Sequence, residues 1–227
     1  DYGKVRTRLA CRLLNLEKNR ELLSQVPHQI WLDLAVVPCC VLMGDELGCA
    51  CILIRYGHMR DWKIDEEALL ADARANMQKI LRPECVPMSD FLYDMMRQTV
   101  GEQLPEAEPG EEENRGLVLD QIAGLLAGRG RPGGRQLLIL SNIQHFYGAS
   151  ALLYPDVQKL LTRGEKGYFI LPSSVHEVLL LEETGNEDRC GLYRMVREVN
   201  EKNVPREEFL SDSVYYFDRK TGRIRIL

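Results

Sequence analysis

The sequence has no long hydrophobic run. A helix that crosses a membrane needs roughly 20 consecutive apolar residues, and the longest apolar run, residues 34–43, is much shorter. A run of that length between polar segments is typical of a buried strand. The sequence therefore predicts no transmembrane helix, and we expect no membrane partner.

An excess of positive charge is also missing. The 227 residues include 29 Lys and Arg against 34 Asp and Glu, which gives a net charge of −5. General nucleic-acid binding depends on clustered cations that contact phosphates, so this balance argues against a nucleic-acid partner. The local exceptions are Arg6, Arg8 and Arg12 near the start and the stretch 129–135. Because of them a nucleic-acid accessory protein is kept as a functional hypothesis, weaker than a binding protein or a hydrolase.

Histidine is scarce, and cysteine is present without a recognisable metal-binding spacing. The four histidines are scattered along the chain, so we expect no metal and no other cofactor. Cys39 and Cys40 flank one side of an expected hairpin turn, and Cys49 and Cys51 flank the other. We interpret them as core cysteines rather than zinc ligands, because adjacent residues of a strand point to opposite faces. A reversible cross-strand disulfide is the alternative, since Cys40 would face Cys51 across a two-residue turn.

The seven cysteines are an odd number, which is typical of reduced thiols in a cytoplasmic protein. Secretion is not indicated either, because Lys4, Arg6 and Arg8 alternate with apolar residues instead of preceding an apolar block. We therefore expect a cytoplasmic location. The chain starts with Asp1 rather than Met, so we expect a further stretch of protein before it.

The hydrophobic pattern that is present predicts an α+β fold with mixed, mainly antiparallel sheets and helices packed on them. The expected strands are residues 4–14, 31–43, 49–55, 136–141, 168–171, 176–181, 214–217 and 224–227. The expected helices are residues 16–23, 66–81, 90–100, 117–126, 188–200 and one or two within 147–161. An acidic and Gly-rich linker, residues 101–134, would separate two similar-sized α+β halves, residues 1–100 and 135–227, or lie within one composite domain.

The most conspicuous polar cluster is Leu-Pro-Ser-Ser-Val-His-Glu-Val, residues 171–178, between two expected strands. Ser174 as nucleophile and His176 as base would make a hydrolytic site, with Glu177 as a third candidate. In an extended segment, however, Glu177 points away from the other two. We favour a tight turn in which Ser173, Ser174 and their neighbours satisfy backbone amides, with a possible binding role for this edge.

Other polar residues are candidates for binding. Asn142, His145 and Tyr147 follow the strand at 136–141, where binding residues are common, but for His145 we favour a role in capping the next helix. His58 and Asp61 follow the second hairpin strand. They could form a metal-binding or an acid–base pair, but a loop anchored by a neighbouring aromatic is the simpler interpretation.

One acidic residue, Asp33, stands at the start of an apolar run. A buried carboxylate needs a partner. We expect an ion pair with one of the arginines near the start of the chain.

The chain also resembles a known family. The resemblance covers residues 15–217, least well at residues 101–134. It is carried by the segment at 171–178 and by seven others: residues 17–23, 32–37, 137–142, 147–149, 152–155, 195–200 and 210–215. These segments are similar to an uncharacterised bacterial protein family of unknown function, common in gut Firmicutes. The resemblance implies a cytosolic bacterial protein and supplies no activity, cofactor or catalytic residue.

The sequence thus favours a binding protein without enzymatic activity, whose partner is a protein or a small molecule. The alternative is a hydrolase that uses Ser174 and His176.

Overall fold

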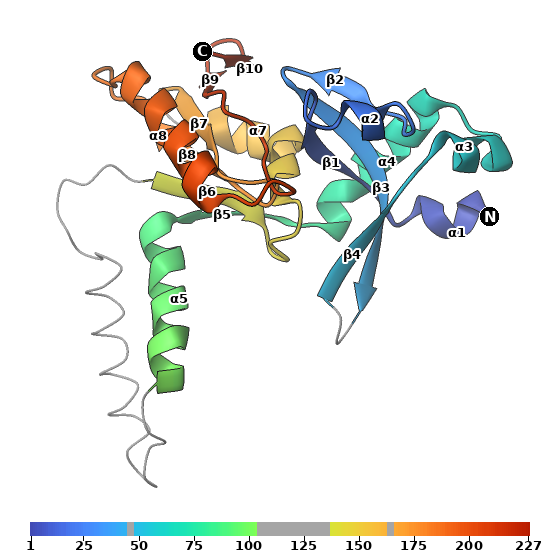
Figure 1. The fold of residues 1–227 in the computed structure, drawn as a ribbon, viewed down its shortest axis with the longest axis horizontal. Coiled ribbons are helices and arrows are strands. Elements are labelled where there is room, and N and C mark those ends of the chain that lie inside the picture. The colour runs from blue at the N-terminus through green and yellow to red at the C-terminus, as the bar shows by residue number, and fades with distance from the viewer. Residues whose placement is uncertain (45–47, 104–136, 163–165) are drawn as a thin grey trace, which may run out of the picture. The chain divides into compact units, whose positions relative to one another are not determined.

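The computed structural model describes residues 1–44, 48–103, 137–162 and 166–227 (Figure 1). The chain divides into two compact units. Unit 1 combines residues 1–85 with residues 140–227, and unit 2 is residues 86–139. Within unit 2 the described elements are helix α5 (Met88–Gln103), the end of the strand at residues 83–87 and the start of the strand at residues 137–142. The expected helix at 117–126 and most of the expected linker, from residue 104 on, lie outside the described residues.

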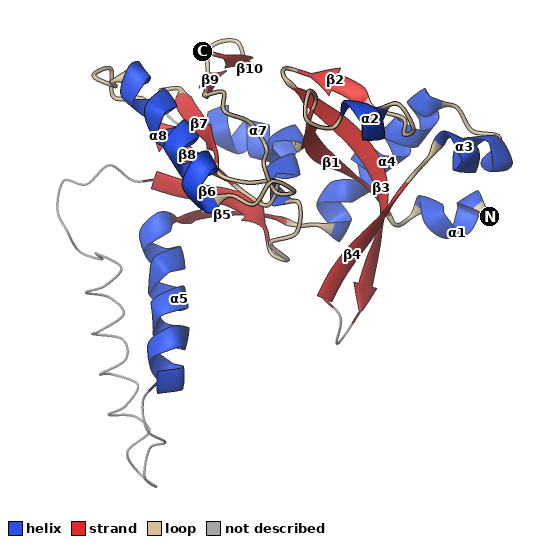
Figure 2. Cartoon of the chain, in the orientation of Figure 1, coloured by secondary structure: helices blue, strands red, loops and turns tan. Residues whose placement is uncertain are grey.

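A four-stranded sheet occupies the amino-terminal part of unit 1 (Figure 2). Its strands are β1 (Leu9–Asn15), β2 (Gln29–Trp31), β3 (Leu34–Gly44) and β4 (Gly48–Leu53). The long strand β3 pairs with β1 on one side and with β2 and β4 on the other, and all these pairs are antiparallel. The sheet is therefore built around the apolar run that the sequence identified as a buried strand.

The start of the chain is helical, so the expected strand over residues 4–14 is wrong in its first half. Helix α1 (Tyr2–Arg6) precedes β1, and the Asp1 side chain accepts a hydrogen bond from the Gly3 amide. Arg6 extends from this helix to Asp72, with Nε 2.8 Å from Oδ2. An amino-terminal cap and a charged partner thus outweigh the alternating pattern.

Three helices follow or connect the strands of this sheet. They are α2 (Arg20–Leu23), α3 (Tyr56–Trp62) and α4 (Glu66–Ile80). Asp65 caps α4 by accepting the Ala68 amide at 2.7 Å, and α4 begins at residue 66, where the sequence predicts that a helix begins. Leu69, Ala73 and Met77 are buried on one face of α4, which packs on β1. Helix α3 was not predicted.

The second sheet has six strands, in the order β10-β9-β7-β8-β6-β5. The strands are β5 (Pro83–Pro87), β6 (Leu137–Asn142), β7 (Tyr168–Pro172), β8 (Val178–Glu182), β9 (Tyr215–Asp218) and β10 (Arg223–Ile226). The helices of this part are the 3-10 helix η1 (Gly148–Leu153), α7 (Pro155–Thr162) and α8 (Arg189–Asn203). The β7–β8, β7–β9 and β9–β10 pairs are antiparallel. With helices beside two largely antiparallel sheets, the fold is α+β as expected.

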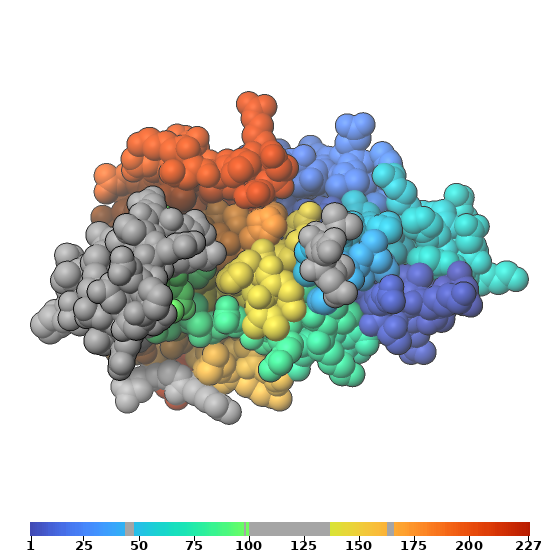
Figure 3. Space-filling model, turned by 90° about the horizontal axis from the view of Figure 1, so that it is seen from below, coloured from blue at the N-terminus to red at the C-terminus, as the bar shows by residue number. Residues whose placement is uncertain are grey.

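Side chains from both ends of the sequence join unit 1 together. Asp33 accepts hydrogen bonds from three hydroxyls, those of Ser211 (2.6 Å), Ser213 (3.0 Å) and Tyr215 (2.6 Å). The expected ion pair between Asp33 and an amino-terminal arginine is therefore wrong, because the carboxylate is hydrogen-bonded by three hydroxyls from residues 211–215 instead. Figure 3 shows the blue and cyan amino-terminal residues and the yellow and orange later residues meeting in one surface.

Candidate functional site

The loop that joins β7 to β8 holds Ser174 in an internal hydrogen-bond network. Ser174 Oγ donates to Glu177 Oε1 at 2.9 Å and accepts the His176 backbone amide at 3.0 Å. The Ser174 amide in turn donates to the Glu177 carbonyl at 3.2 Å. Ser174 is also buried. The hydroxyl is thus used to shape a tight turn, as in the interpretation that the sequence favoured.

The His176 ring is held by a different set of groups. Its Nδ1 lies 3.0 Å from the His145 carbonyl and 3.3 Å from the Tyr147 amide, and the ring stacks on Tyr147 with 5.5 Å between the ring centroids. Its Nε2 lies 3.8 Å from Glu208 Oε1. A nucleophile and its base must share a hydrogen bond. The structure brings Ser174, His176 and Glu177 into one loop, but it pairs the serine hydroxyl with Glu177 and the imidazole with backbone groups.

Asn142 organises the neighbouring loop. Its fully buried side chain donates to the Phe146 carbonyl at 2.9 Å and accepts the amides of Gln144 and Phe146 at 3.1 and 3.2 Å. This arrangement presents His145 at the surface, with its Nε2 3.9 Å from Glu84 Oε2. The segment from Asn142 to Tyr147 thus contacts the His176 ring through its backbone, and Asn142 itself has a structural role.

An open pocket of about 400 Å³ lies beside this loop. It is lined by His145, Ser173, Ser174, His176, Glu177, Val199, Asn203, Val204, Pro205 and Glu208. The pocket collects five of the candidate residues. The pocket is lined by two carboxylates and two imidazoles but by no lysine or arginine. It therefore offers little positive charge to an anionic ligand.

His58 and Asp61 lie elsewhere, on helix α3. His58 Nδ1 accepts the Arg55 amide at 3.1 Å at the start of the helix, and the ring stacks on Trp62 with 5.5 Å between centroids. The predicted anchoring on an aromatic is present, although on a helix rather than a loop. Across residues 1–44, 48–103, 137–162 and 166–227, no three His, Cys, Asp or Glu side chains converge to hold a metal ion.

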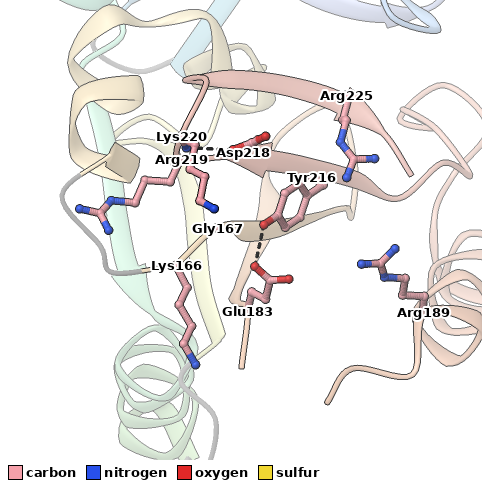
Figure 4. Close-up of a pocket in the computed structure, with 9 residues that line it drawn as sticks. All are labelled: Lys166, Gly167, Glu183, Arg189, Tyr216, Asp218, Arg219, Lys220 and Arg225. Atoms are coloured by element: carbon pink, nitrogen blue, oxygen red, sulfur yellow. Dashed lines mark hydrogen bonds between the residues drawn. The ribbon is translucent and has the colours of Figure 1, made fainter. Parts of the chain in front are cut away.

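A second pocket is larger and strongly basic (Figure 4). It is open, has a volume of about 620 Å³ and lies around the end of the six-stranded sheet formed by β7, β9 and β10. Its cationic residues are Lys166, Arg189, Arg219, Lys220 and Arg225, and its acidic residues are Glu183 and Asp218. Cations therefore outnumber carboxylates in the lining by five to two.

Tyr216 is the aromatic centre of this basic pocket. Its hydroxyl donates to Glu183 Oε2 at 2.6 Å, and the Arg225 guanidinium lies 5.1 Å from its ring centroid. Burial and the hydrogen bond to Glu183 raise the pKa of Tyr216 to about 12. Tyr216 therefore stays a neutral phenol. Figure 4 shows the Arg189 and Arg225 guanidinium groups turned toward the space beside its ring.

Gly167 makes the position of Tyr216 possible. A Cβ at this residue would collide with the Tyr216 hydroxyl and would lie 2.7 Å from the Phe217 carbonyl oxygen. The backbone here also fixes Glu183, whose amide donates to the Gly167 carbonyl at 2.9 Å. A residue without a side chain is thus needed where β7 begins beside the pocket.

Sequence reasoning missed the basic pocket. Its residues come from five separate places in the chain, and no local motif unites them. The available signal was the last hairpin, where Arg219 and Lys220 occupy the turn and Arg223 and Arg225 alternate with isoleucines. That alternation predicts one basic edge but does not reveal that Lys166 and Arg189 join it.

Comparisons with known proteins give a family and no activity. No curated protein matches the chain, and no solved structure does. A family model described as a family of unknown function, DUF5688, matches residues 1–219. Because the match covers almost the whole sequence, the chain belongs to the DUF5688 family of unknown function.

Proposed function

We propose that this protein is a binding protein for a small, multiply charged anion of the phosphate-ester type, which it holds in the basic pocket. The observation that carries the proposal is the excess of five cationic over two acidic side chains around one concave space. Arginine and lysine are the residues that bind phosphate oxygens most strongly, through charge-assisted hydrogen bonds.

The two carboxylates are already engaged, which supports this assignment. Glu183 accepts the Tyr216 hydroxyl at 2.6 Å. Asp218 Oδ1 accepts the amides of Lys220 at 2.8 Å and Thr221 at 3.4 Å within the β9–β10 turn. Both acids therefore have structural partners inside the pocket wall, and the cations are left with a net attraction for an anion.

The size of the pocket favours a small ligand over a nucleic acid. Its volume of about 620 Å³ lies in the range typical of small-molecule sites. The chain as a whole carries a net charge of −5, which would repel a long polyanion outside the pocket. As part of this proposal we place the activity in the bacterial cytoplasm, which the cysteine usage and the family resemblance predict.

Calorimetric titration with inorganic pyrophosphate at low salt tests the proposal. We expect saturable binding that weakens as salt is added, because screening reduces attraction between exposed charges. Arg225→Gln and Arg189→Gln should each reduce affinity roughly tenfold or more, the loss of one charge-assisted hydrogen bond. Lys202→Gln is the matched control, because Lys202 pairs with Glu198 at 2.5 Å on α8 and does not line the pocket.

Two results would contradict the proposal. The first is an absence of pyrophosphate binding to the folded protein at low salt. The second is equal binding by the pocket variants and the Lys202→Gln control, which would assign the affinity to general surface charge.

A further inference from the structure

Three chemically distinctive side chains share one face of the four-stranded sheet. Arg12 on β1 is opposite Val37 on β3, and Cys39 follows Val37 on the same face. Cys51 on β4 is opposite Val41, so it is the diagonal neighbour of Cys39. The turn is longer than two residues and Cys40 is opposite Ile52. The pair on one face is therefore Cys39 with Cys51, and not Cys40 with Cys51.

Among the described residues, Arg12 is a buried cation without a carboxylate partner. It is only 9% exposed, and its Nε has no hydrogen-bond partner among those same residues. No ion pair joins it to any Asp or Glu in the part of the chain that the structure describes. Instead its NH1 lies 3.7 Å from Cys51 Sγ, and its guanidinium lies 4.7 Å from the centroid of the Tyr147 ring. A buried charge is costly unless it is paired, and Cys51 is the contacting group that readily becomes an anion.

The two thiols are arranged for different roles. Cys51 is partly exposed, whereas Cys39 is only 2% exposed. A hydrogen bond with Cys39 and the charge of Arg12 together lower the pKa of Cys51 to about 7, against the effect of its burial. The same hydrogen bond and burial raise the pKa of Cys39 well above its usual range. Of the two thiols, Cys51 is therefore the one that ionises first as pH rises, while Cys39 keeps its proton.

We propose that Cys51 is a nucleophile that reacts with hydroperoxides, stabilised as a thiolate by Arg12, and that Cys39 is its resolving thiol. The Cys51 thiolate attacks one peroxide oxygen, the O–O bond breaks, and the leaving oxygen takes a proton to become water or an alcohol. Cys51 is thereby oxidised to a sulfenic acid and the peroxide is reduced. Cys39 sulfur then attacks Cys51 sulfur. A disulfide forms, and the released hydroxide takes the Cys39 proton to become water.

This reactive pair is independent of the basic pocket, whose residues lie around the other sheet. An external dithiol would reduce the disulfide and restore both thiols. The inference gives the protein a redox-sensitive site that the anion-binding proposal does not require.

Peroxide labelling of the whole chain tests the inference. The Cys39→Ser protein is treated with limiting hydrogen peroxide and a sulfenic-acid-specific diketone, and modified cysteines are identified by mass spectrometry. We expect Cys51 to be labelled well ahead of Cys49, which is also partly exposed and lies on the same strand. In the unsubstituted protein we expect a Cys39–Cys51 disulfide that dithiothreitol reverses. Cys49→Ser is the matched control and should leave both products unchanged.

A pH profile and Arg12 variants distinguish a Cys51 thiol activated by Arg12 from one that reacts only because it is exposed to solvent. The groups that interact electrostatically with Cys51 are Arg12, Cys39, Cys40 and Tyr147. Because the thiolate fraction grows as pH rises, the rate of Cys51 alkylation should increase through pH 7 and then level off. Arg12→Met should reduce that rate at pH 7 roughly tenfold. Arg12→Lys keeps the charge and should retain most of it, and circular dichroism checks that both variants are folded.

Three results would overturn the inference. If Cys51 is labelled no faster than Cys49, Cys51 is not the nucleophile. If the rate of Cys51 alkylation is unchanged in folded Arg12→Met, the guanidinium does not activate the thiol. If Cys51 sulfenic acid accumulates in the unsubstituted protein without a disulfide, Cys39 is not the resolving thiol.

Discussion

At the scale of single residues, Asp33 shows how far a local pattern can mislead. Its place at the start of an apolar strand correctly indicates that the carboxylate needs partners. The nearest candidates along the sequence were arginines, but the structure supplies three hydroxyls from residues 211–215. Burial and the hydrogen bond to Asp33 raise the pKa of Tyr215 well above its usual range, so this donor keeps its proton.

Asp33→Ala should lower the free energy of unfolding by about 2–3 kcal/mol, because hydroxyl donors to a charged acceptor lose their partner. Urea denaturation followed by circular dichroism measures the change. Asp61→Ala is the control. It removes an exposed carboxylate from α3 and should change stability by less than about 0.5 kcal/mol. Similar losses in the two variants would contradict the role of Asp33.

Gly167→Ala should displace Tyr216, because the new methyl group would collide with the tyrosine hydroxyl and would lie 2.7 Å from the Phe217 carbonyl oxygen. We expect both a loss of stability and pyrophosphate binding weakened severalfold, since Arg225 packs over the displaced ring. Gly57→Ala is the control, because a Cβ at Gly57 meets nothing within 4 Å and the residue lies in helix α3. Equal pyrophosphate affinity in both variants would show that Tyr216 does not shape the pocket.

At the scale of elements, the sequence predicts best where one segment determines its own structure. The cap at Asp65 and the spacing of Leu69, Ala73 and Met77 are local signals, and α4 begins at the residue they indicate. Helix α1 was missed because its residues also alternate, and the partner that holds it, Asp72, lies far along the chain. The Ser174 turn was predictable from composition. The basic pocket was not, since it depends on how the last hairpin meets Lys166 and Arg189.

Asp65→Ala should destabilise the protein by about 1 kcal/mol through loss of the cap on the Ala68 amide. Asp188 precedes α8 in the same position but makes no side-chain cap hydrogen bond. Asp188→Ala is therefore the matched control and should cost less. Urea denaturation of the two variants measures the difference, and an equal cost would show that the α4 cap contributes nothing of its own.

At the scale of the whole molecule, unit 1 is discontinuous in sequence. Residues 1–85 and 140–227 form it together, and residues 86–139 leave and return by the neighbouring strands β5 and β6. Besides Asp33, Asn15 Nδ2 donates to the Leu210 carbonyl at 3.0 Å and Tyr154 Oη donates to the Leu81 carbonyl at 2.9 Å. Contacts between these distant segments could not be derived from local periodicity, and they decide which polar groups are satisfied.

Residues 1–103 expressed alone should therefore fail to fold, because the partners of Asp33 and Asn15 are absent. Co-expression with residues 137–227 should yield a complex that co-purifies and has the far-ultraviolet circular dichroism of a folded α+β protein. A fragment 1–103 that unfolds cooperatively on its own would contradict the prediction. The separately expressed fragment 137–227 provides the second comparison.

The hydrogen bonds between Asp33 and residues 211–215 also determine when unit 1 can fold during protein synthesis. Ser211 lies 178 residues after Asp33, so a ribosome releases the amino-terminal sheet long before it makes the groups that complete it. Unit 1 can then be completed only after residues 211–215 have been made, and until then the polar groups they satisfy lack their partners. A premature stop codon shortly before residue 211 would consequently remove all three hydroxyl donors to Asp33 and prevent unit 1 from being completed.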